Sequence, residues 1–78
     1  MKNNELYVLK CAIKDLENEL KVIPPDSISF KLLKTRINRG IELYDRLRVK
    51  HGALETQDID DIASFYQLSA LYIDFIYA

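Results

Sequence analysis

The sequence has few of the residues on which covalent or metal-based stabilisation depends. Its 78 residues include one cysteine, one histidine and no tryptophan, so no disulfide can form within the chain. A site with several Cys and His ligands, the usual zinc set, is excluded for the same reason, and we expect neither a metal nor a cofactor. Glycine and proline occur twice each, which leaves little of the chain for loops. No apolar run approaches the roughly 20 residues that a membrane-spanning helix needs, and we expect no membrane contact.

Composition and length are those of one small folded domain. The chain is 49% hydrophobic and 29% charged with a net charge of −1, which is typical of a globular protein. We therefore expect a single domain, residues 1–78. A core of this size is marginal, so we expect regular helix packing, oligomerisation or both to stabilise it. The lone thiol is typical of a reducing compartment and residues 1–5 do not resemble a signal peptide, so we expect a cytoplasmic protein.

The first predicted helix covers residues 4–22. Its apolar residues recur at alternating spacings of three and four, which forms an unbroken heptad seam. The seam consists of Leu6, Leu9, Ile13, Leu16, Leu20 and Ile23. Pro24 and Pro25 end this helix, because proline lacks an N–H and restricts the residue before it.

A second helix is predicted over residues 27–51. Asp26, Ser27 and Ser29 are each suitable N-caps, because their side chains accept hydrogen bonds from free backbone N–H groups. The expected inward stripe consists of Phe30, Leu33, Ile37, Ile41, Tyr44 and Leu47. Gly40 lies beside this stripe, which indicates close approach of a neighbouring helix, or alternatively a kink or a ligand contact. The His-Gly pair at 51–52 is expected to end the helix with a left-handed glycine cap.

The third predicted helix covers residues 57–77. Thr56 is expected as its N-cap, and acidic residues follow at the positive end of the helix dipole. The expected inward stripe consists of Ile59, Ile62, Tyr66, Ser69, Ile73 and Ile76. Because short links force neighbouring helices to run antiparallel, we predict an all-α fold, an up-down-up three-helix bundle with coiled-coil-like heptad seams.

The C-terminal half of the third helix carries more apolar residues than one inward face can use. Phe65, Leu68, Leu71, Tyr72 and Phe75 lie off the expected stripe. Either this helix forms an interface with a second copy or another protein, or the other two helices splay and enclose it. Because two-fold homodimers are the commonest oligomers, we predict a homodimer that forms through this helix. Its predicted self-interface consists of Phe65, Leu68, Tyr72 and Phe75.

Charge is segregated between the helices. Residues 27–51 contain seven Lys and Arg against two acidic residues, whereas residues 53–77 contain five acidic residues and no Lys or Arg. Arg36, Arg39, Arg46 and Lys50 follow a second helical row that is expected to point away from the apolar stripe. This basic row is either a solvated face, a docking surface for an acidic partner or for the acidic helix of another copy, or a phosphate site. The net charge disfavours a general nucleic-acid binder, which is usually strongly basic.

The sequence contains no recognisable pattern of catalytic residues, and we do not expect an enzyme. There is no glycine-rich phosphate loop, nucleophile elbow or metal-binding helix motif. Cys11 falls on the outer face of the first helix with no base at a suitable spacing. Asp74 lies among apolar residues, where we expect it to pair with an Arg of the second helix; a buried acid in a functional pocket is the alternative.

Two hypotheses on function follow from this pattern. The leading one is a small cytoplasmic regulator or inhibitor, homodimeric and non-catalytic, that covers the surface of a larger, acidic partner protein. Small helical proteins that act in this way include accessory proteins of phages and mobile elements. The alternative is a protein that binds the phosphate of a nucleotide or nucleic acid through the basic row.

Overall fold

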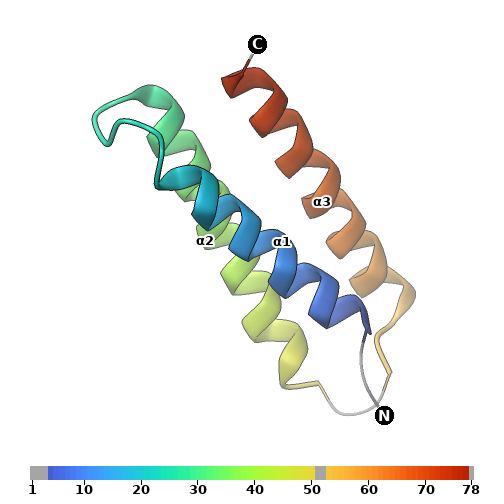
Figure 1. Cartoon of the computed structure of the whole chain (residues 1–78). Coiled ribbons are helices and arrows are strands. Elements are labelled where there is room, and N and C mark those ends of the chain that lie inside the picture. The colour runs from blue at the N-terminus through green and yellow to red at the C-terminus, as the bar shows by residue number, and fades with distance from the viewer. Residues whose placement is uncertain (1–3, 51–52, 78) are drawn as a thin grey trace.

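Three helices make up the described part of the chain, which is residues 4–50 and 53–77 of the computed structural model (Figure 1). They are α1 (Asn4–Leu20), α2 (Ile28–Arg48) and α3 (Thr56–Ile76), and the described residues form no strand. The predicted all-α class is thereby confirmed. None of these three helices is long and apolar enough to cross a membrane.

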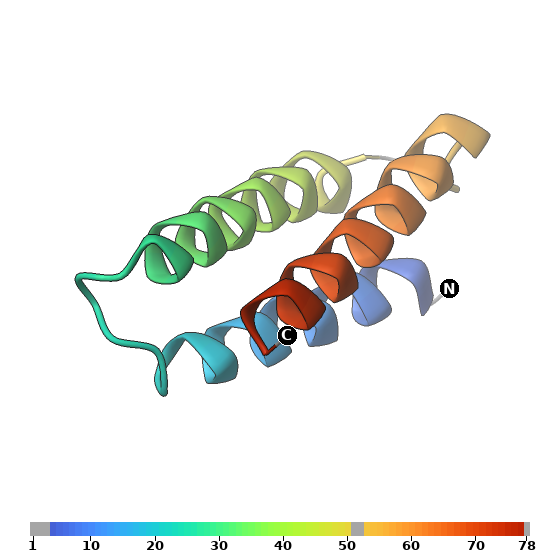
Figure 2. The ribbon, with the colours of Figure 1, turned by 90° about the horizontal axis from the view of Figure 1, so that it is seen from above.

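The chain reverses direction at each of the two links between the helices, as Figure 1 and Figure 2 show from two sides. α1 and α2 make the most extensive contact of the three helix pairs, and α3 packs across both. At its C-terminal end α3 approaches the end of α1, where the Tyr77 hydroxyl donates a hydrogen bond to Glu19. This hydrogen bond is the main cause that raises the pKa of Tyr77 above its usual value. In Figure 1 the same end of α3 lies apart from the beginning of α2.

The helix ends depart from the predicted ones by a few residues. Ser27 caps α2, because its side chain accepts a hydrogen bond from the backbone N–H of Phe30 at 3.1 Å. At its other end α2 stops at Arg48, earlier than predicted, and the predicted glycine cap lies outside the described residues. The N-cap of α3 is Glu55, so the prediction of Thr56 is wrong by one residue.

Each helix contributes one face to a common core. The buried apolar residues of the described chain are Leu9, Ala12, Ile13, Leu16, Ile23, Leu33, Ile37, Leu47, Ile62 and Phe65. All residues of the predicted first-helix seam lie in this core or pack against it. Burial of each large aliphatic side chain contributes about 2 kcal/mol relative to exposure in water, so this core is the main source of stability.

The buried face of α3 differs from the predicted stripe. Ile59 and Tyr66, two predicted inward residues, are exposed, and so is Ile41 on α2. Phe65, predicted to lie off the stripe, is buried with 3% of its surface exposed. These parts of the prediction are wrong. On α3 the reason is that the helix is turned so that the Phe65 ring enters the space beside Gly40.

Gly40 lets this ring approach the backbone of α2. A Cβ atom on Gly40 would lie 2.5 Å from Cζ of Phe65 and 2.9 Å from Cγ1 of Ile13. Both distances are far below van der Waals contact between carbon atoms, about 3.5–4.0 Å. The prediction of close helix approach at Gly40 therefore holds, and α1, α2 and α3 all meet at this point.

We predict that Gly40→Ala destabilises the chain, although alanine is the better helix former by about 1 kcal/mol. The added methyl group forces the enclosed Phe65 ring to move, and such overpacking costs typically about 1–3 kcal/mol. The free energy of unfolding from urea denaturation measures the effect.

The matched control is Asn38→Ala, an exposed position on the same helix, where no loss is expected. In a Phe65→Leu background the smaller side chain leaves room for the methyl group, so the cost of Gly40→Ala should fall. An equal cost in both backgrounds would show that Phe65 does not set the requirement for glycine.

Candidate binding surface

Two members of the predicted basic row form ion pairs with the beginning of α3. The Nη2 atom of Arg46 lies 3.1 Å from Oδ2 of Asp61. The Nζ atom of Lys50 lies 2.7 Å from Oδ2 of Asp58 and 3.6 Å from Glu55. The short link between the helices brings the basic end of α2 beside the acidic start of α3. Half of the basic row is therefore neutralised within the chain, and the row is not one free face.

Asp58 is the centre of the second ion pair. It is buried, and its carboxylate also accepts a hydrogen bond from the backbone N–H of Glu55 at 3.0 Å, which fixes the first turn of α3. The ammonium group of Lys50 and this N–H hold the pKa of Asp58 below its usual value. The same contact with Asp58 raises the pKa of Lys50.

Arg36 lies between α2 and α3, half-buried, and does not point away from the apolar stripe as predicted. Its guanidinium group lies over the Phe65 ring, 4.8 Å from the ring centre, and 5.8 Å from the centre of Tyr72. The buried Nε atom has no hydrogen-bond partner among the described residues. Burial lowers the pKa of Arg36, Tyr72 opposes that shift, and the neighbouring charge of Arg39 adds to it. The side chain is thus a partly desolvated cation next to a second cation.

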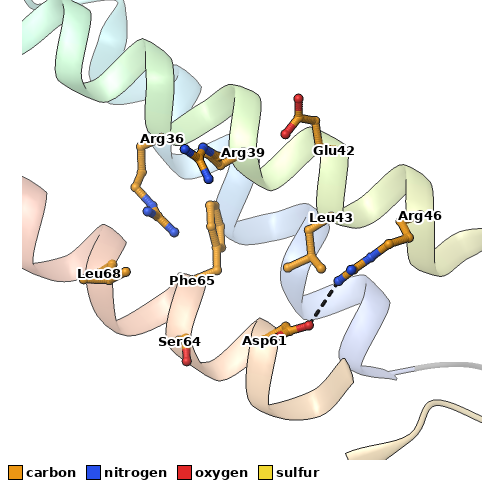
Figure 3. A pocket seen from close by; sticks show the side chains of 9 residues that line it. All are labelled: Arg36, Arg39, Glu42, Leu43, Arg46, Asp61, Ser64, Phe65 and Leu68. Atoms are coloured by element: carbon orange, nitrogen blue, oxygen red, sulfur yellow. Dashed lines mark hydrogen bonds and ion pairs between the residues drawn. The ribbon is translucent and has the colours of Figure 1, made fainter. Parts of the chain in front are cut away.

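A hollow of about 510 Å³ lies between α2 and α3 around these arginines (Figure 3). We call it the arginine hollow. It is lined by Arg36, Arg39, Glu42, Leu43, Arg46, Asp61, Ser64, Phe65 and Leu68. Within the described chain, Arg46 and Asp61 pair with each other, whereas neither Arg36 nor Arg39 has an ion-pair partner. Ser64 could not be found from the sequence, because only the turn of α3 brings it to the hollow.

An exposed apolar strip continues from the arginine hollow along α3. Leu68, Leu71 and Phe75 share one side of the helix at spacings of three and four, and they are 43%, 61% and 66% exposed. We call these three residues the α3 flank. Leu68 belongs to both features, so the basic row and the self-interface, predicted as separate surfaces, adjoin. Of the other predicted self-interface residues, Tyr72 is half-buried and Phe65 lies in the core, so Phe65 cannot meet a second copy directly.

Two other residues that the sequence analysis considered lie apart from this surface. Asp74 is exposed and has no ion pair within the described chain, so the prediction of an arginine partner is wrong. Cys11 is exposed on α1. Residues 4–50 and 53–77 contain no group of three or more His, Cys, Asp and Glu residues that could hold a metal ion.

We predict that the destabilisation by Asp58→Asn depends on pH. Because the pKa of Asp58 is lower in the folded chain than in the unfolded one, its stabilising effect is complete above the usual value of 3.8 and is lost as the pH falls below it. The difference in free energy of unfolding between the wild type and Asp58→Asn should therefore be largest near neutral pH. Urea denaturation over a series of acidic pH values measures it.

Asp60→Asn is the matched control, because Asp60 is exposed on the same helix turn and forms no ion pair with the described residues. It should change stability little at any pH. A constant difference for Asp58→Asn down to strongly acidic pH would contradict the role given to its charge.

The arginine hollow and the α3 flank adjoin each other on the surface of the described chain. The first offers unpaired positive charge beside an aromatic ring, and the second offers uncovered apolar surface. Comparison of the chain with protein-family models, curated proteins and solved structures finds no match.

Proposed function

We propose that this chain is a small cytoplasmic binding protein without catalytic activity, which works as a homodimer and regulates or inhibits a larger protein by covering its surface. The single observation that carries the proposal is the exposure of the α3 flank. Three large apolar side chains in one strip on a chain of 78 residues are a feature of interaction sites rather than of free surface.

The α3 flank is proposed as the self-interface. A second copy would cover Leu68, Leu71 and Phe75, and the two-fold symmetry of a homodimer would use the same strip on each chain. This revises the residues of the interface, since Leu71 is added and the buried Phe65 and the half-buried Tyr72 are left out. The marginal core of so small a domain supports the dimer, because burial of further apolar surface adds to stability.

The larger partner is proposed to have an acidic surface that meets the arginines beside this strip. Arg39 is exposed, and neither it nor Arg36 has an ion pair within the described chain. Charge complementarity of this kind sets the orientation and the association rate of a complex more than its affinity. Arg46 and Lys50, which pair with Asp61 and Asp58, contribute less to such a contact.

We predict that Leu71→Glu and Phe75→Glu convert the homodimer into a folded monomer. Each places a charge in a strip that pairing would bury, and burial of an unpaired charge is strongly unfavourable. Light scattering during size-exclusion chromatography gives the mass, and circular dichroism gives the helix content. Ala70→Glu is the control, because it adds the same charge at the adjacent exposed position on a different side of α3. A monomeric wild type would contradict the assignment of the α3 flank as the self-interface. An equal loss of dimer in Ala70→Glu would contradict it as well.

A second prediction concerns the larger partner. A tagged wild-type chain should retain one protein from a host lysate at low salt, in stoichiometric yield, and Arg39→Glu should lose it. Raised salt should also release this protein, because the contact relies on exposed charges that salt screens. A retained protein that Arg39→Glu holds equally well would show that the acidic partner does not bind through these arginines.

A further inference from the structure

The arginine hollow contains two positive charges that the described chain does not neutralise. Arg36 is held in place by the aromatic rings beneath it, and its buried Nε atom has no partner among the described residues. Arg39 adds a second charge close enough to affect the titration of the first. Arg36 is half-buried and Arg39 is exposed on the same hollow, so their mutual repulsion is unfavourable unless an anion lies between them.

Other groups around the hollow limit what this anion can be. Ser64 also lines it, but in Figure 3 its hydroxyl is directed away from the two arginines. Asp61 is occupied by Arg46 and by the side-chain amide of Gln57. Glu42 lies at the rim, and in Figure 3 its carboxylate is directed away from Ser64 and Phe65, to the other side of α2.

We infer that the arginine hollow is a binding site for a phosphate group, held between the guanidinium groups of Arg36 and Arg39. A phosphate monoester carries a charge of about −1.5 to −2 at neutral pH, which matches two arginines, whereas a carboxylate carries one charge. Its several oxygens also suit the planar, bidentate donor sets of two guanidinium groups.

The volume of the hollow leaves room for more than the phosphate group. About 510 Å³ is within the range of small-ligand sites, and Leu43 and Leu68 offer apolar contact to the rest of the molecule. The ligand class is therefore a phosphate monoester with an organic remainder. A long nucleic-acid track does not fit, because the ion pairs of Arg46 and Lys50 interrupt the basic row.

This site goes beyond the proposed function, because the isolated chain can bind a phosphate group without a second copy or a partner protein. Titration with sodium phosphate at constant ionic strength, followed by NMR of the backbone amides, tests it directly. We expect saturable shifts at Arg36, Arg39 and Ser64, and weaker effects of sodium acetate at the same concentration.

Three variants separate a specific site from general charge attraction. Arg39→Gln should weaken phosphate binding by about tenfold or more, as expected for lost hydrogen bonds between charged groups. Arg48→Gln is the matched control, because Arg48 lies on the same helix outside the hollow and should leave binding unchanged. Glu42→Gln should strengthen binding, since it removes the negative charge at the rim.

Two phosphate monoesters distinguish the source of the group. Adenosine monophosphate represents a free nucleotide, and O-phosphoserine represents a modified protein side chain. If either compound binds more tightly than inorganic phosphate, the result supports the site. The compound that binds more tightly then identifies the kind of organic group that the site accepts beside the phosphate. The proposal is overturned if phosphate causes no saturable shift, if acetate binds as well as phosphate, or if Arg48→Gln weakens binding as much as Arg39→Gln.

Discussion

The packing of the Phe65 ring determines both the core of this chain and the chemistry of its surface. One side of the ring fills the space at Gly40, where a side chain of any other residue would collide with it and with Ile13. The guanidinium group of Arg36 lies 4.8 Å from the ring centre. An arginine held on aromatic rings loses part of its hydration but keeps its charge. The contact that joins the three helices thus also creates the unpaired cation of the arginine hollow.

Much of the fold follows from the periodicity of the sequence, but the rotation of α3 does not. The inward face of the first helix was predictable, and Ser27 was one of three residues expected to cap the second, because each depends on residues within one segment. The C-terminal half of α3 is apolar on several sides, so its own spacing is compatible with more than one inward face. The choice depends on a space in another helix, beside Gly40, which the Phe65 ring enters. The residues of α3 alone therefore do not determine which of its faces is buried.

Part of the site was predictable, and the errors in its prediction have a cause related to the one for α3. Segregated charge was interpreted as a surface for another molecule, although the predicted link already placed the end of the second helix beside the start of the third. Arg46 and Lys50 accordingly find Asp61 and Asp58 in their own chain. An intramolecular partner has the advantage, because the chain itself holds the two groups at high effective concentration.

The arginine hollow and the α3 flank share Leu68, so under the two proposals the occupation of one would affect the other. A second copy on the α3 flank would cover the edge of the hollow and exclude water from it. Lower water access strengthens the attraction between the arginines and a phosphate group, because the local dielectric constant falls. Coupling between two binding events is reciprocal, so a bound phosphate group would stabilise the dimer by the same free energy. Under the proposed function, the phosphate ligand would therefore control how much of the chain is dimeric, and it would compete with an acidic partner for the same two arginines.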